Sequence, residues 1–235
     1  MIKRRFIRCV WGIYDNSHRI TARRQKIDGD IKMIKECKFN EPFKVYIYGK
    51  DNYDRLVKDG FDCTLVDDCP NPFDLIKHQY RHKLELIKYA MEKDGYDELV
   101  YLDWDCVPQK KLPDDFWERC AKRGVIQGCL QQYRRLKCMW RPVDRRKVIN
   151  GGFFYIRDKT IPNEIIEIWK TMPQDNDEPA IAKFLDKQLG GWDNSERCLK
   201  EVWDTYETPF CVLWNSYPWT KEMIETKDKC FIHFI

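Results

Sequence analysis

Apolar residues recur along the chain in two alternating patterns, as short runs and as longer stretches with helical spacing. Runs typical of buried strands occupy residues 5–14, 43–48, 61–66, 99–102, 125–130, 152–157, 210–213 and 230–234. Apolar residues three or four positions apart predict helices over residues 21–37, 53–58, 73–93, 116–122, 163–170 and 179–189. This alternation predicts an α/β fold, a three-layer α/β/α sandwich around a mostly parallel mixed sheet.

Length and composition fit one folded domain of this class. The 235 residues are 43% hydrophobic and 34% charged, which excludes a disordered chain and a disulfide-dependent miniprotein. A net charge of +4 does not by itself indicate nucleic-acid binding. No apolar run approaches the roughly 18 residues of a membrane span, and we expect no signal peptide. The 11 cysteines form no Cys-x-x-Cys pair, so we expect reduced thiols and a cytoplasmic protein.

The strand at residues 99–102 runs directly into Asp103-Trp104-Asp105. Side chains two positions apart in an extended chain point to the same side, so Asp103 and Asp105 can converge on one cation. Open α/β sheets bind ligands at the carboxyl ends of their strands. Two carboxylates together with diphosphate oxygens suit Mg²⁺ or Mn²⁺. The alternative is an acidic pair that only faces solvent.

Further motifs accompany Asp103-Trp104-Asp105 along the chain, at residues 80–86, 148–156, 176–178, 211–215 and 231–234. Together these motifs resemble those of the GT-A-fold glycosyltransferases, and their order and spacing are similar to the retaining family 8 group of glycogenin and bacterial galactosyltransferases. The resemblance covers most of the chain. It implies a single GT-A domain over residues 1–235, with nucleotide binding at about residues 1–110 and acceptor binding at about residues 111–235.

The resemblance implies that Asp103, Asp105 and His233 hold a divalent metal on the diphosphate of a nucleotide sugar, expected to be a UDP-sugar. An imidazole among oxygen ligands favours Mn²⁺ over Mg²⁺. His233 could instead be an ordinary strand histidine. The family continues after this histidine with a glycine and a Lys-Pro-Trp segment, whereas this sequence reads only to Ile235. Either the protein continues further, or another cation contacts the phosphates.

The resemblance also implies a set of residues for the donor nucleotide. They are Trp11, Tyr14, Asp15, Arg81, Lys83, Asp103 and Trp104. An aromatic side chain after the first strand would stack on the base, while Arg81 or Lys83 would approach the nucleotide or its sugar. The alternatives are that Trp11 and Tyr14 belong to the core and that Lys83 lies on a solvated helix face.

Asn150, Gly151, Gly152 and Trp214 are implied to contact the donor sugar or the acceptor. Glycines let a substrate approach the backbone closely, although the same residues could form only a tight turn.

Asp177 and Glu178 are the expected catalytic carboxylates. One of them would act as general base in an inverting reaction or would stabilise a cationic transition state in a retaining one. They precede a helix expected to open at Pro179, and the partial positive charge of its N-terminus predicts that both are ionised. Alternatively, Asp177 only caps the helix.

Two other functions share these residues. Asp103-Trp104-Asp105-Cys106-Val107 matches the motif of haloacid-dehalogenase-like phosphatases, in which Asp103 attacks phosphorus and Asp105 acts as acid and base. Those enzymes carry the motif on their first core strand, which disfavours this alternative. Residues 134–147 contain seven cations with interleaved aromatic residues and could bind nucleic acid, or could only cover the donor. The sequence thus predicts a metal-dependent glycosyltransferase whose acceptor is a glycan, a protein or modified DNA.

Overall fold

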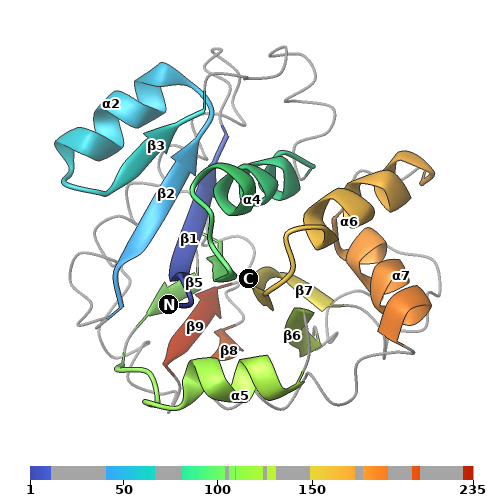
Figure 1. Cartoon of the computed structure of the whole chain (residues 1–235). Coiled ribbons are helices and arrows are strands. Elements are labelled where there is room, and N and C mark those ends of the chain that lie inside the picture. Colours follow the sequence, from blue (N-terminus) through green and yellow to red (C-terminus); the bar gives the residue numbers. More distant parts are fainter. Residues whose placement is uncertain are drawn as a thin grey trace.

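A computed structural model of the chain confirms the expected α/β class (Figure 1). The structure describes residues 1–11, 41–66, 81–103, 106–108, 110–123, 126–130, 149–172, 177–189, 203–206 and 230–234. Within these ranges a six-stranded sheet has helices on both faces, and a three-stranded sheet lies beside it. The helix expected over residues 21–37 and the strand expected over residues 210–213 lie outside the described residues.

The larger sheet has the strand order β3-β2-β1-β4-β7-β6. Its strands are β1 (Arg4–Val10), β2 (Phe43–Ile47), β3 (Cys63–Leu65), β4 (Glu98–Leu102), β6 (Ile126–Leu130) and β7 (Ile149–Ile156). β1 pairs in parallel with β2 and β4, and β2 pairs in parallel with β3. β7 runs antiparallel to both β4 and β6. The start of β7 therefore lies at the same edge as the carboxyl ends of β1 to β4.

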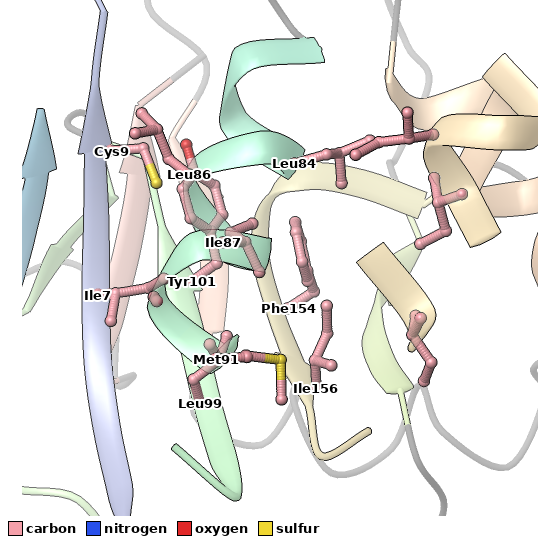
Figure 2. Close-up of a cluster of buried hydrophobic side chains, with 14 of the residues drawn as sticks. Ile7, Cys9, Leu84, Leu86, Ile87, Met91, Leu99, Tyr101, Phe154 and Ile156 are labelled. Carbon is pink, nitrogen blue, oxygen red and sulfur yellow. The ribbon is translucent and has the colours of Figure 1, made fainter. Parts of the chain in front are cut away.

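The described helices form two layers on the two faces of this sheet. They are α2 (Lys50–Lys58), α4 (Arg81–Lys93), α5 (Phe116–Arg123), α6 (Ile161–Lys170) and α7 (Asp177–Leu189). Alternate residues of β1 point to opposite faces, so Ile7 joins the core under α4, α6 and α7, and Phe6 joins the core under α5. α4 buries Leu84, Ile87 and Met91 against β1, β4 and β7 (Figure 2). This arrangement is the expected three-layer sandwich.

The smaller sheet has the order β5-β9-β8, with β5 (Cys106–Pro108), β8 (Trp203–Tyr206) and β9 (Phe231–Phe234). β9 was expected from the sequence, whereas β5 and β8 were not. β5 is only three residues long and β8 four, which is too short for a recognisable alternation. Cys106 and Phe231 pack in the same core cluster as Phe6, so this sheet lies on the α5 side of the larger one.

Two elements begin earlier than the apolar pattern predicts. β7 begins at Ile149 instead of residue 152, so Gly151 and Gly152 lie inside a strand. α7 begins at Asp177 instead of Pro179, so both expected catalytic carboxylates belong to its first turn. In the part of the chain that the structure describes, every helix is too short or too polar to cross a membrane.

Candidate functional site

Four chain segments that are distant in sequence meet at the carboxyl end of β4. Asp103 follows β4 directly, and its N–H donates to the carbonyl of Gly152 in β7 at 2.8 Å. The N–H of Gly151 donates to Glu178 Oε1, in the first turn of α7, at 3.1 Å. Lys83, in the first turn of α4, reaches the same point. The structure therefore brings Asp103, Gly151, Gly152 and the Asp177-Glu178 pair together at one edge of the sheet.

The Lys83 ammonium connects these segments. Its Nζ donates to Asp177 Oδ2 at 2.6 Å and to the Gly151 carbonyl at 2.7 Å, and it lies 3.6 Å from Asp103 Oδ1. The Lys83 side chain is only 2% exposed, so the alternative of a solvated helix face is wrong. Burial alone would lower the Lys83 pKa, but the charges of Asp103 and Asp177 outweigh it and raise that pKa. Lys83 is therefore charged at neutral pH.

Asp103 is oriented by a residue that the sequence analysis missed. The buried Tyr101 hydroxyl donates to Asp103 Oδ1, and the two side chains lie on the same side of the chain because they are two positions apart. That spacing was the available signal. The Asp103 side chain remains 30% exposed, so its carboxylate can contact a ligand from the solvent side.

Asp177 and Glu178 have different surroundings despite being adjacent. The Asp177 side chain is 3% exposed and is held by Lys83, whereas Glu178 is half-buried beside Gly151. Burial first, and the negative charge of Asp177 second, raise the pKa of Glu178 to about 8. The expectation that the helix N-terminus keeps Glu178 ionised is therefore wrong, because loss of hydration outweighs the helix dipole here.

The raised pKa of Glu178 predicts a stability that falls with rising pH. The folded state holds the Glu178 proton up to about pH 8, whereas the unfolded state releases it near the ordinary value of 4.5. Between these values the folded state binds more protons, so this group removes up to about 1.4 kcal/mol of unfolding free energy per pH unit. We expect Glu178→Gln to abolish that decline.

The measurement is the free energy of unfolding in urea for the wild type and the variant at several pH values from 4.5 to 8.5. Subtracting one free energy from the other at each pH cancels the contributions of the other titrating groups. Glu167→Gln, at an exposed position of α6, is the matched control and should follow the wild type. A wild-type curve parallel to that of Glu178→Gln would contradict the assignment.

Gly151 is required by the packing of Asp177. A Cβ atom at this position would lie 2.5 Å from Asp177 Oδ2, closer than side chains tolerate. The carboxylate cannot retreat without lengthening its contact with Lys83. We expect Gly151→Ala to lower the unfolding free energy by about 1–3 kcal/mol. Urea unfolding at neutral pH checks this, and an unchanged midpoint would show that the carboxylate moves freely.

The other expected residues are only partly described. Arg81 pairs with Glu85 at 2.9 Å and keeps a third of its side chain exposed at the start of α4. Trp11 follows β1 at the same edge of the sheet and packs, half-buried, against the core beneath α4. Asn150 lies in β7 next to the site. Tyr14, Asp15, Trp104, Asp105, Trp214 and residues 134–147 lie outside the described residues.

The strand register bears on the expected metal site. β9 pairs antiparallel with β5, and His233 lies opposite Cys106, the residue that follows Asp105. Among the described side chains, no group of three or more His, Cys, Asp or Glu is arranged to hold a metal ion. The exposed oxygen-donor carboxylate of Asp103 fits a hard divalent cation, and the register brings the backbone of His233 to the segment that carries Asp105.

Comparison with known proteins identifies the fold. No protein-family model matches the sequence, and no curated protein sequence matches it. The structure is similar to that of the glycosyltransferase GlyE from Streptococcus pneumoniae TIGR4, with a TM-score of 0.50 and 14% identity over 80% of this chain. The chain spans 44% of the length of GlyE. This likeness agrees with the expected glycosyltransferase-type α/β fold.

Two further solved structures have lower TM-scores. A glycosyltransferase involved in glycosylation of the major capsid of PBCV-1 has a TM-score of 0.45 and 14% identity. The matched region covers 97% of this chain and 91% of the glycosyltransferase chain. A cytidylyltransferase from Leptospira borgpetersenii has a TM-score of 0.44 and 10% identity. The matched region covers 81% of this chain and 73% of the cytidylyltransferase chain.

Proposed function

We propose that the chain is a metal-dependent glycosyltransferase that moves a sugar from a nucleotide-sugar donor, a UDP-sugar, to an acceptor. The observation that carries this proposal is the convergence of Lys83, Asp103 and Glu178 around Gly151 at the carboxyl end of β4. Ligands of open α/β sheets bind at this edge. The fold shared with GlyE supports the proposal, and similarity to family 8 rests on the sequence motifs.

In this proposal Asp103, Asp105 and His233 hold Mn²⁺ or Mg²⁺. The cation would offset the negative charge that develops on the departing diphosphate. Tyr101 orients the carboxylate of Asp103 through its hydroxyl, and Lys83 supplies a fixed positive charge 3.6 Å from it. Such preoriented charges stabilise a transition state without the reorganisation that water would need.

The residues along this edge of the sheet are assigned to binding the donor nucleotide and the sugar. Trp11, with Tyr14 and Asp15, would contact the base and ribose from the end of β1, and Trp104 would lie on the donor side. The exposed part of Arg81 would contact the nucleotide. Asn150, Gly152 and Trp214 would contact the sugar or the acceptor. The Cβ side of Gly151 is already filled by Asp177, so Gly151 serves the protein's own carboxylates.

Of the two expected catalytic carboxylates, the geometry favours Glu178. Asp177 is buried, and its carboxylate is already paired with Lys83 at 2.6 Å. Glu178 is half-buried, and its pKa of about 8 is close to neutral pH, the range in which a general base is most effective. Asp177 is therefore assigned to positioning Lys83, and Glu178 is assigned to proton transfer.

This division of roles predicts different effects for two conservative variants. Glu178→Gln should lower the turnover number at least about a hundredfold with little change in donor affinity, because it removes a group that acts in the reaction. Asp177→Asn should act mainly by destabilising the fold, since it removes the counter-charge of Lys83. Steady-state kinetics combined with urea unfolding separate the two effects. Near wild-type turnover of Glu178→Gln would contradict its assignment.

Ligand binding tests the proposed function without knowledge of the acceptor. A ligand that occupies the folded site far above its dissociation constant raises the melting temperature. We expect at least one UDP-sugar to raise it in the presence of Mn²⁺ and to have little effect in EDTA. Asp114→Asn, at an exposed surface position, should respond like the wild type. Equal responses of the wild type with and without Mn²⁺ would contradict the metal dependence.

A further inference from the structure

Arg8 is a fully buried arginine in the central strand β1, with an exposure of 0%. Its neighbours along the strand, Ile7 and Cys9, belong to the hydrophobic core. Arginine is almost never fully buried unless its guanidinium has partners, because removal of the charge from water costs several kcal/mol. Two described partners of this guanidinium lie on one short segment of the chain.

Both partners are backbone carbonyls that flank Trp104-Asp105. Arg8 Nη1 donates to the carbonyl of Asp103, and Nη2 donates to the carbonyl of Cys106 at 2.7 Å. The N–H of Cys106 also donates to the carbonyl of Asp103 at 3.0 Å, and this hydrogen bond joins the two ends of the Asp103–Cys106 turn. The guanidinium lies over the ring of Phe43 at 5.2 Å, which fixes it from the β2 side.

We propose that Arg8 is a positioning residue that fixes the Asp103–Cys106 turn for cation binding. This inference rests on the proposed function. A planar guanidinium offers two donors in a rigid fork, so it holds both carbonyls at a set separation, which the single ammonium of a lysine does not. Arg8 therefore holds the backbone at Asp103 and at Cys106, the two described residues on either side of Trp104-Asp105 in the sequence.

The same contact extends to the third expected ligand. Cys106 opens β5 and pairs with His233 of β9. By holding the Cys106 carbonyl, Arg8 links the core strand β1 to the small sheet that carries His233. One buried side chain thus connects the backbone around all three residues proposed to hold the cation. Groups that orient metal ligands without contacting the metal themselves typically contribute about 10–100-fold to metal affinity.

The test is the dissociation constant of Mn²⁺ in the presence of UDP, measured by electron paramagnetic resonance on the full chain. We expect Arg8→Lys, which keeps the charge and one hydrogen bond, to weaken binding about tenfold, and Arg8→Met to weaken it up to about 100-fold. Amide hydrogen exchange at Cys106 should accelerate in both variants without metal. Arg5→Met is the matched control on β1, because Arg5 pairs with the exposed Asp62 and should leave Mn²⁺ binding unchanged.

The outcomes separate this inference from the proposed function. Wild-type Mn²⁺ affinity and wild-type exchange at Cys106 in Arg8→Lys would overturn the role of Arg8 and leave the proposed function intact. Failure of the wild type and Arg5→Met to bind Mn²⁺ with UDP would overturn the proposed function, and the inference with it. If a variant unfolds at 25 °C, the titration is done in sucrose, which favours the compact state.

Discussion

Replacing Lys83 by methionine is expected to lower the free energy of unfolding by about 3–5 kcal/mol. The substitution leaves the carboxylate of Asp177, which is 3% exposed, without its counter-charge, and it removes the donor to the Gly151 carbonyl. An uncompensated buried charge costs far more than the lost attraction of an exposed ion pair. Urea unfolding at neutral pH measures the loss.

Lys88→Met is the matched control for this effect. Lys88 lies on the same helix, and its ammonium donates to Asn163 Oδ1 at 3.0 Å from an exposed position. That variant should stay close to the wild type. The double variant Lys83→Met/Asp177→Leu should recover most of the stability, since it removes both charges. If Lys83→Met is no less stable than Lys88→Met, the buried ion pair does not hold the site together.

Asp103→Asn is expected to lower Mn²⁺-dependent sugar transfer about 10³-fold, because a bound cation supplies several kcal/mol of transition-state stabilisation. The amide retains the shape of the side chain and can still accept the hydrogen bond from the Tyr101 hydroxyl. The effect on the melting temperature should therefore be much smaller than that of Lys83→Met. Rates of donor turnover at saturating Mn²⁺ measure the loss.

Asp114→Asn removes a carboxylate of the same kind from a surface position that is 87% exposed. It controls for a general effect of net charge and should leave the rate unchanged. A rate for Asp103→Asn within a few-fold of the wild type would show that the Asp103 carboxylate does not serve the reaction.

The layers of the fold follow from local patterns. Leu84, Ile87 and Met91 are spaced so that one face of α4 is apolar, which predicts both the helix and the side that it buries. Residues 99–102 of β4 are a continuous apolar run followed directly by Asp103, so a buried strand with a polar carboxyl end could be predicted. β5 and β8 could not be predicted, because strands of three and four residues are too short to show a pattern and are defined by their pairing with β9.

The site was predictable where it depends on chain direction and unpredictable where it depends on long-range packing. Asp103 and Glu178 lie at the predicted edge because the parallel strand β4 ends there and the helix α7 begins there. The burial of Lys83 depends on Asp177, 94 positions away, and no local pattern encodes that pairing. The raised pKa of Glu178 likewise comes from its burial beside Asp177, which the helix start alone does not reveal. The sequence signal for Arg8 is a cation between the apolar residues Phe6-Ile7 and Cys9-Val10.

Every sugar transfer from a UDP-sugar releases UDP, and water can replace the acceptor in this reaction. We expect the wild type to release UDP from at least one UDP-sugar with Mn²⁺, and we expect EDTA or Asp103→Asn to abolish the release. The proposed function would be contradicted if no nucleotide sugar yields a nucleoside diphosphate. It would equally be contradicted if Mn²⁺ supports only phosphate release from a phosphomonoester, which is the reaction of a phosphatase that uses Asp103 as nucleophile.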